Sequence, residues 1–232
     1  MNFKNDKKII LILFLLVIIG FIFVNCENFD SENPKSYSQI GQDLKVLKHF
    51  NNKKYGYFIE VGANDGITLS NTYILEKDYN WYGICIEPVP SIYNKLKQNR
   101  KSINVPNAVY NTNDKMVKII DANLLSGIRE DIDAHKHILN NKKEVMVRTK
   151  TLTTIMNENN APTFIDYLSI DTEGSELKIL EGIDFDKYTF GYINIEHNYV
   201  EPRRTQMKKK LLENGYKYLG ENKFDDIYVK EN

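Results

Sequence analysis

The sequence has few cysteines and no excess of charge of either sign, and each absence narrows its interpretation. Its two cysteines, Cys26 at the end of an apolar run and Cys85 inside a predicted buried strand, are not expected to pair, so the fold does not depend on a disulfide. The 31 basic and 31 acidic residues cancel, and no basic stripe indicates a nucleic acid as partner. Residues 37–232 contain no internal repeat, and this segment is long enough for one domain with a substantial core.

Two common nucleotide-binding glycine loops are also missing. A P-loop requires a lysine after its last glycine, and none follows Gly66; the dinucleotide fingerprint Gly-x-Gly-x-x-Gly is not matched either. The segment Glu60–Gly66 instead reads acid-x-Gly-x-x-x-Gly after an apolar run. A glycine-rich turn between a strand and a helix lets a ligand approach bare backbone. This loop therefore favours a nucleoside with a positive centre, and the alternative is an ordinary strand-to-helix turn.

The next predicted strand, Trp81–Glu87, also ends in an acid. Glu87 follows Gly66 by the length of one helix and one strand. An acid at the end of a second strand is placed to bind the 2′- and 3′-hydroxyls of a ribose. Pro88 and Pro90 then stop the strand and start the next helix.

Segments of strand length and helix length alternate along the rest of the chain. We predict helices near 44–50, 69–76, 91–99, 152–157, 175–181 and 204–214, with Ser175 as an N-cap. We predict strands near 55–61, 81–87, 103–109, 116–120, 145–149, 166–171 and 192–196, and a closing hairpin from 216–219 and 227–229. This alternation predicts an α/β fold, with a mostly parallel sheet, helices on both faces and a C-terminal antiparallel hairpin at the edge.

Polar residues follow four of these strands. Ligands of such sheets bind beyond the carboxyl ends of the strands, so these residues should converge on one rim. They are Glu60–Gly66, Glu87, Asp171–Gly174 and Glu196–Asn198. The alternative is that some of them only cap helices, as Asp171 does if it precedes the helix at Ser175.

The chain resembles the FkbM-type methyltransferase family over residues 37–230. The segments that carry the resemblance are Ser38–Asp43, Phe58–Gly66, Ser70–Thr72, Trp81–Pro88, Leu125–Ile128, Leu168–Gly174 and Glu196–Asn198. The resemblance implies a class I methyltransferase (Rossmann-like) fold, S-adenosylmethionine as cofactor and, usually, methylation of a hydroxyl oxygen. Such methyltransferases usually have a glycine where this chain has Asn64, and asparagine tolerates the same positive φ.

The resemblance and the predicted rim together predict which residues bind the cofactor, which catalyse the reaction and which could bind a metal ion. Expected cofactor-binding residues are Glu60, Gly62, Asn64, Asp65, Gly66, Glu87 and Asp171. An acceptor alcohol needs a base or a cation to lower its pKa, and the expected catalytic residues are Asp171, Glu173 and His197. A divalent cation, Mg²⁺ or Mn²⁺, is the alternative, with Asp171, Glu196, His197 and Asn198 as its ligands. The acceptor is expected to be a small molecule or a glycan.

The N-terminus carries an apolar run, residues 9–24, with lysines before it and acids after it. Residues 9–26 approach the length of a membrane-spanning helix and are interpreted as an uncleaved signal anchor. The charge asymmetry places residues 1–8 in the cytosol and the domain on the lumenal or extracytoplasmic side, after a linker at 27–36. A cleaved signal peptide is the alternative for this segment. For the whole protein, the alternative to an enzyme is a membrane-tethered binding or trafficking protein that keeps the fold.

Overall fold

The computed structural model describes residues 34–132 and 141–231, nearly all of them in the unit that begins at Ser36. The predicted cytosolic segment 1–8, the predicted anchor 9–26 and most of the predicted linker 27–36 lie outside the described residues. Within the two described ranges, no helix combines the length and the apolar character needed to cross a membrane.

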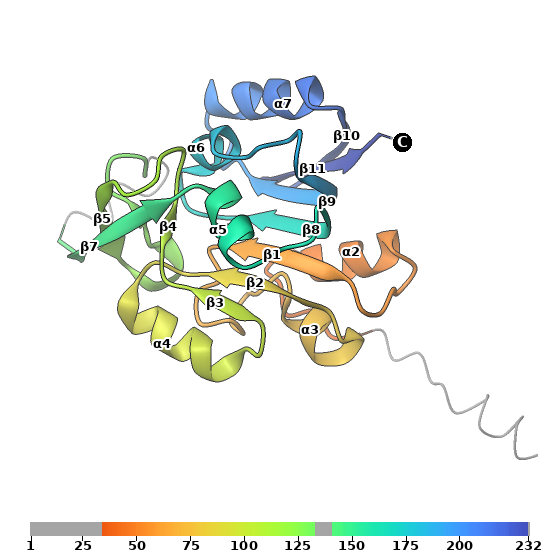
Figure 1. Cartoon of the computed structure of the whole chain (residues 1–232), viewed down its shortest axis with the longest axis horizontal. Coiled ribbons are helices and arrows are strands. Elements are labelled where there is room, and N and C mark those ends of the chain that lie inside the picture. Colours follow the sequence, from red (N-terminus) through yellow and green to blue (C-terminus); the bar gives the residue numbers. More distant parts are fainter. Residues whose placement is uncertain (1–33, 133–140, 232) are drawn as a thin grey trace, which may run out of the picture. The chain divides into compact units, whose positions relative to one another are not determined.

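A seven-stranded sheet forms the centre of this unit (Figure 1). Its order is β10–β11–β9–β8–β1–β2–β3, and every neighbouring pair from β9 to β3 is parallel. The strands are β1 (Tyr57–Val61), β2 (Tyr82–Ile86), β3 (Ile103–Val105), β8 (Phe164–Ile170), β9 (Thr189–Glu196), β10 (Tyr216–Asn222) and β11 (Asp225–Lys230). The predicted antiparallel hairpin is confirmed: β10 is the edge strand, and β11 runs antiparallel between β10 and β9.

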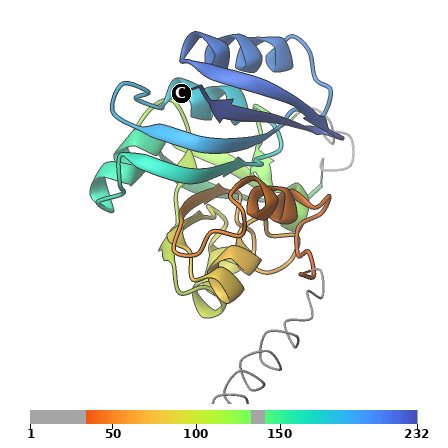
Figure 2. The same cartoon turned by 90° about the vertical axis from the view of Figure 1, so that its right-hand side faces the viewer.

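Helices cover both faces of the sheet, because the strands have apolar side chains on both sides. The helices are α2 (Gln42–His49), α3 (Tyr73–Tyr79), α4 (Pro90–Asn99), α5 (Leu152–Glu158), α6 (Glu176–Glu181) and α7 (Arg203–Glu213). Residues of α5, α6 and α7 form one core with Ile59 and Ile84, and residues of α2, α3 and α4 form another with Phe58 and Cys85. Figure 2 shows α7 beside the β10–β11 hairpin.

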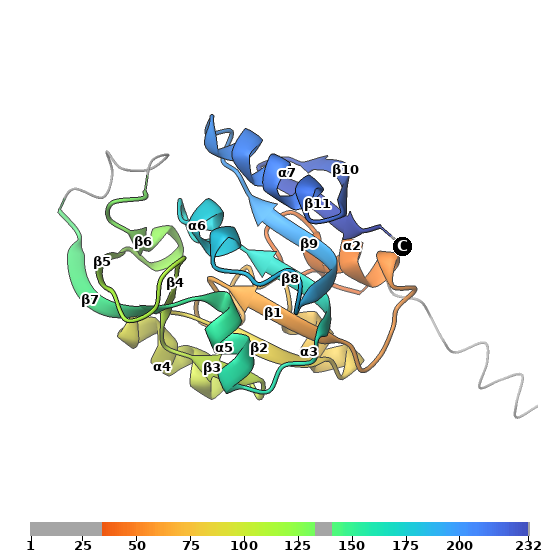
Figure 3. The same cartoon turned by 45° about the horizontal axis from the view of Figure 1, so that its top comes forward.

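A second, four-stranded sheet was not predicted from the sequence. Its order is β4–β7–β5–β6, with bounds Ala108–Val109, Lys143–Lys150, Met116–Asp121 and Gly127–Ile128. It packs on Val89 and Ile92 of the α4 region through a small core of its own. Figures 1 and 3 show it beyond the arrowhead of β1, at the carboxyl ends of the parallel strands.

Three local predictions differ from the structure. The helix expected from Leu69 begins at Tyr73, because Ser70–Thr72 bond to the carboxylate of Glu60 and form a loop instead. The single strand expected at 103–109 divides at Pro106, and its second half pairs with β7 of the small sheet. Ser175 does precede α6, but its hydroxyl donates to Asp131 and does not cap the helix.

Candidate active site

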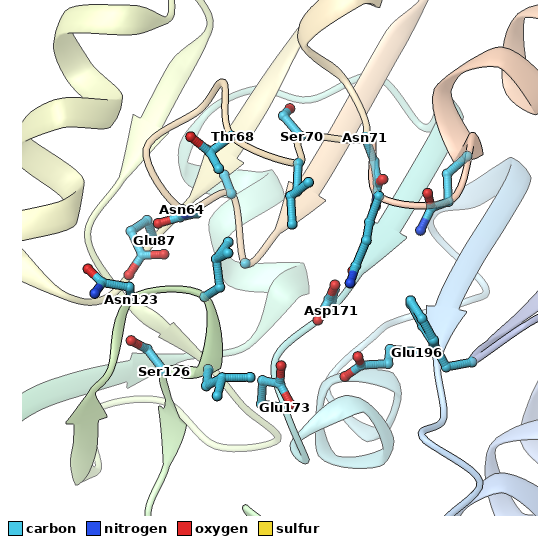
Figure 4. Close-up of a pocket in the computed structure, with 18 of the residues that line it drawn as sticks. Asn64, Thr68, Ser70, Asn71, Glu87, Asn123, Ser126, Asp171, Glu173 and Glu196 are labelled. Carbon is cyan, nitrogen blue, oxygen red and sulfur yellow. The ribbon is translucent and has the colours of Figure 1, made fainter. Parts of the chain in front are cut away.

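A cavity of about 490 Å³ lies at the carboxyl ends of β1, β2, β8 and β9 (Figure 4). Its lining residues come from the predicted rim, from the loop at 68–71, from the start of α2 and the segment before it, from the 3-10 turn Asn123–Leu125 and the residue after it, and from the turn between β10 and β11. They are Gln39, Gln42, Gly62, Ala63, Asn64, Thr68, Leu69, Ser70, Asn71, Glu87, Asn123, Leu124, Leu125, Ser126, Asp171, Glu173, Glu196, Asn198 and Phe224. The volume lies within the usual range for small-molecule and cofactor sites.

Gly62 allows the loop after β1 to lie directly against the loop after β8. It adopts φ +87°, and a Cβ atom there would lie 1.8 Å from the backbone oxygen of Asp171. The amides of Gly62 and Ala63 both donate to the carbonyl of Ile86, at 3.0 Å each. Asn64 also has positive φ, at 48°, and lines the cavity, so asparagine satisfies the backbone there as expected.

Asp65 and Gly66, the other two residues expected in the cofactor loop, are not among the cavity-lining residues. The Asp65 carboxylate accepts from the amides of Ile67 and Thr68, and these bonds outweigh burial and lower its pKa. Gly66 is needed for packing, because a Cβ would lie 2.6 Å from the side chain of Arg100. Both residues shape the loop without lining the site.

Glu60 is buried and also lies outside the lining of the cavity. Its two carboxylate oxygens accept from the Ser70 hydroxyl, the Asn71 amide and the Thr72 hydroxyl. Arg100 completes the group with an ion pair at 3.4 Å, in which both side chains are almost fully buried. These contacts fix the loop between β1 and α3, and they give no support to the prediction that Glu60 contacts a ligand.

Glu87 does line the cavity, at the end of β2. Its side chain is 5% exposed, and Oε1 accepts from the amide of Val89 at 2.8 Å. Burial raises the pKa of Glu87 to about 7, against the lowering effect of bonds from Val89 and Asn64. A carboxylate held in this way can accept bonds from the hydroxyls of a ribose.

Asp171, Glu173 and Glu196 gather at the other end of the cavity (Figure 4). One carboxylate oxygen from each lies within 4.8 Å of the other two. Burial, reinforced by the charge of Asp225 and other neighbouring carboxylates, raises the pKa of Asp171 well above its usual range. Burial and Asp171 do the same to the pKa of Glu196. Glu196 Oε2 is buried and has no hydrogen-bond partner among the described residues.

His197 is fully buried and is not among the cavity-lining residues. Its Nδ1 accepts from the amide of Tyr199 at 3.0 Å, and its Nε2 lies 3.6 Å from Asp226 of the hairpin. Burial lowers the pKa of His197, so the neutral ring is favoured. Asn198 lines the cavity with φ +44°. Of the expected metal ligands, the structure therefore brings Asp171 and Glu196 together and adds Glu173 in place of His197.

The predicted site omitted several side chains that line this cavity. Gln42 is held rigidly: its Nε2 donates to Asp225 at 3.0 Å, and its Oε1 accepts from the amide of Ile40 at 3.0 Å. Asn71 donates to Ser169, and its buried Oδ1 has no partner among the described residues. Gln42 and Asn71 lie in segments that carried the family resemblance, which was the available clue. No motif or residue pattern in the sequence identified Asn123 or Phe224 as residues of the site.

Comparisons with known proteins support the methyltransferase interpretation. The model of the methyltransferase FkbM domain matches residues 60–218, more than half of the chain. No match was found among curated proteins.

Solved structures with a similar fold are distant in sequence. A methyltransferase FkbM from Methylobacillus flagellatus KT is 14% identical, with a TM-score of 0.49, over 87% of this chain and 46% of that protein. A TehB-like SAM-dependent methyltransferase from Corynebacterium glutamicum is 8% identical, with a TM-score of 0.45, over 91% and 97% of the two chains. A precorrin-6y C5,15-methyltransferase from Geobacter metallireducens is 10% identical, with a TM-score of 0.44, over 89% and 95%. This chain thus spans about half the length of the Methylobacillus protein.

The family assignment rests on the domain match, and the family implies S-adenosylmethionine as the methyl donor. The residues present fit that donor, with Gly62 and Asn64 exposing backbone beside the cavity and Glu87 at the same end as Asn64. The architecture is the mostly parallel α/β sheet with a C-terminal antiparallel hairpin that the sequence predicted. The chain belongs to the FkbM methyltransferase family.

Proposed function

We propose that this protein transfers the methyl group of S-adenosylmethionine to a hydroxyl oxygen of a small molecule or a glycan. The observation that carries the proposal is one cavity with two chemically different ends. Glu87, Asn64 and the 3-10 turn lie at one end, and Asp171, Glu173 and Glu196 lie at the other (Figure 4). In the reaction, the methyl carbon bonds to the acceptor oxygen as its bond to sulfur breaks, and the electron pair stays on sulfur. The hydroxyl proton leaves to a base, which gives a methyl ether and S-adenosylhomocysteine.

The Glu87 end suits the nucleoside of the donor. A buried carboxylate at the end of the second strand is placed to accept bonds from the two ribose hydroxyls. A smaller cavity of about 40 Å³ adjoins this end, between the main sheet and the small sheet. Apolar side chains such as Val109, Ile119 and Ile128 line it. They offer apolar contacts beside the proposed nucleoside site.

The acidic end suits activation of the acceptor. Asp171 and Glu173 line the cavity and are the proposed bases, whereas His197 is turned toward the hairpin. The proposal includes a divalent cation, Mg²⁺ or Mn²⁺, as the alternative way of lowering the pKa of the hydroxyl. Glutamine and asparagine side chains from Gln39, Gln42 and Asn198 also line the cavity and can both donate to and accept from an acceptor with several hydroxyls.

Calorimetry with S-adenosylmethionine and S-adenosylhomocysteine tests the donor site. The full-length protein in detergent should bind with a Kd in the micromolar range, about −8 kcal/mol. Glu87→Ala should weaken binding by about 1.5–3 kcal/mol, because it removes bonds from the ribose to a charged group. Glu213→Ala, which removes an exposed glutamate of α7, is the matched control and should change nothing.

Two results would count against the proposal. Unchanged affinity in Glu87→Ala would remove Glu87 from the donor site. Absence of binding at millimolar ligand would favour a non-catalytic binding protein that keeps the methyltransferase fold.

We also propose that residues 9–26 anchor the protein in a membrane, with residues 1–8 in the cytosol. The support is the lysine-flanked apolar run in the sequence. The full-length protein should resist carbonate extraction, and protease added to intact membranes from the cytosolic side should spare the domain. Digestion of the domain from the cytosolic side would indicate the opposite orientation. A mature N-terminus near residue 25 would indicate a cleaved signal peptide.

A further inference from the structure

Aromatic side chains that are exposed to solvent gather at one edge of the main sheet. Among the described residues four aromatic side chains are exposed, and three of them lie at or just before the starts of the adjacent strands β8, β1 and β2. Tyr82 begins β2 beside Tyr57 of β1, with their rings 6.4 Å apart. Phe164 begins β8, and the register of β8 with β1, continued backwards, places it level with Tyr55. We call Tyr55, Tyr82 and Phe164 the aromatic edge.

The backbone holds Tyr55 in a conformation that packing of its ring does not explain. Its φ is +61°, in the left-handed region that costs stability for most residues other than glycine and asparagine. Its amide donates to the carbonyl of Tyr79 at 3.1 Å, which fixes this conformation. Yet Tyr55 is 76% exposed, the largest value among the exposed large apolar side chains in the described ranges. A strained backbone that presents a large ring to solvent indicates a contact outside the described residues.

The aromatic edge and the cavity lie at opposite edges of the sheet. The cavity is at the carboxyl ends of the parallel strands, and the aromatic edge is at their amino ends. The chain enters the unit along α3, because the Tyr37 ring packs on Tyr73 at 4.8 Å and its hydroxyl accepts from Lys77 at 3.0 Å. Helix α3 leads from the end of β1 to the start of β2, so its last turn, with Lys77, lies toward the starts of the strands. Figures 1 and 3 show α3 on this side, away from the small sheet.

The length of the linker limits how far the domain can move from a membrane. The proposed anchor ends at residue 26, and the linker of residues 27–36 spans at most roughly 35 Å when fully extended. A domain of this size has a diameter of about 40 Å. The linker is therefore no longer than the domain itself, and an anchored domain always has one face beside the bilayer.

We propose that the aromatic edge lies in the interface of the bilayer in which the protein is anchored. Tyrosine combines an apolar ring with a polar hydroxyl, and such side chains are enriched at the boundary between lipid and water. Lys54 is exposed directly before Tyr55, and a lysine there can keep its ammonium group among the headgroups while its methylenes contact lipid. Entry of the chain along α3 brings this side of the domain to the membrane.

The proposal deepens the proposed function, and it rests on the proposed anchor. Because the cavity lies at the opposite edge of the sheet, it faces away from the bilayer when the aromatic edge is in contact with it. The acceptor then reaches the cavity from the aqueous side. A water-soluble molecule or the exposed part of a glycan meets this condition, whereas a lipid whose hydroxyl stays in the interface does not.

Hydroxyl-radical footprinting of the full-length protein in phosphatidylcholine nanodiscs tests the contact. Tyr199 follows the cavity-lining Asn198 and is 60% exposed, so without a membrane contact the more exposed Tyr55 should be oxidised at least as fast. In nanodiscs we expect the reverse order, with Tyr55 oxidised roughly threefold or more slowly than Tyr199, because lipid covers its ring. Equal rates, or faster oxidation of Tyr55, would overturn the proposal.

A pair of double variants tests whether the other two aromatic residues make the contact. Tyr82→Ser with Phe164→Ser should raise the oxidation rate of Tyr55 in nanodiscs to at least that of Tyr199. Leu212→Ser with Leu219→Ser, which removes two similarly exposed leucines of α7 and β10, is the matched control and should leave Tyr55 protected. The midpoint of urea unfolding shows that each variant is folded. Protection that is retained in the first variant, or lost in the control, would contradict the assignment to the aromatic edge.

Carbonate extraction separates failure of the anchor from failure of the aromatic edge. If carbonate extracts the protein but nanodiscs still protect Tyr55, the anchor is refuted and the membrane contact is supported. If the protein resists extraction but Tyr55 is oxidised as fast as Tyr199, the anchor is supported and the contact is refuted. Protection in detergent that increases with protein concentration would assign the aromatic edge to a second copy of the chain and overturn the membrane contact. Donor binding by calorimetry is independent of all these outcomes.

Discussion

Gly62→Ala tests whether the floor of the cavity depends on backbone contact between two loops. Gly62 has φ +87°, and an added Cβ would lie 1.8 Å from the oxygen of Asp171. That oxygen belongs to the backbone after β8, and the amide of Asp171 is itself bonded to Val61 at 3.1 Å. The neighbour therefore cannot move aside as a flexible side chain would, and the two loops must separate.

The magnitude follows from a comparison with Gly41→Ala. Gly41 has a similar φ of +78°, but nothing lies within 4 Å of its would-be Cβ. Alanine at Gly41 should cost only the left-handed backbone conformation, about 1–2 kcal/mol of unfolding free energy. Alanine at Gly62 adds overpacking to the same cost, typically 1–3 kcal/mol and here at the upper end. The total for Gly62→Ala is thus about 3–5 kcal/mol.

Urea unfolding followed by tryptophan fluorescence measures both variants. Trp81 is the single tryptophan of the chain, and it is buried within the unit that contains both glycines. The midpoints convert to free energies if the slopes are unchanged. Equal losses in the two variants would refute the steric argument and leave only backbone strain. A Gly62→Ala protein that is as stable as the wild type would refute both.

Three further predictions concern buried polar groups. Glu60→Gln should cost about 3 kcal/mol of stability, because it leaves the buried guanidinium of Arg100 with only one of its two carboxylate partners; a negligible loss would show that the network is not stabilising. Burial raises the pKa of Glu87 to about 7, so the stability it contributes is present below its unfolded pKa and is lost as the pH rises through 7. The wild type should therefore lose stability relative to Glu87→Gln between about pH 5 and pH 8, and parallel pH profiles would contradict this. His197→Asn should remain more stable than His197→Leu by about 1–2 kcal/mol, because an asparagine oxygen can still accept from the Tyr199 amide; equal losses would argue against that bond.

The class of fold could be predicted from the sequence because the pattern that identifies each strand or helix lies within its own short segment. The alternation of strand-length and helix-length segments, and the hairpin at the end, follow from residue spacing that each segment carries by itself. The position of the polar rim follows as well, since all parallel strands of one sheet end on the same side. Glu87, Asp171, Glu173 and Glu196 do line one cavity.

The sequence did not contain the direction in which each rim side chain points. Glu60 and Glu87 both occur at the ends of apolar strands, yet Glu60 is bound by Arg100 from beyond α4, and only Glu87 lines the cavity. Arg100 is distant in the sequence, and no local pattern relates it to Glu60. The small sheet escaped prediction for a similar reason, because β4 and β7 pair across a long interval of chain.

Glu196 and His197 are adjacent in the sequence, and they show the same difference between what the sequence predicted and what the structure decided. The sequence determined that an acid and an imidazole end the fifth parallel strand of the core. Successive side chains of a strand point to opposite faces, so one of the two had to turn away from a ligand on the other's face. The pairing of Glu196 with Asp225 of β11 fixed the choice, and it placed His197 near Asp226. That pairing forms only when the hairpin packs on β9, and for this reason only the tertiary structure decided which residue lines the site.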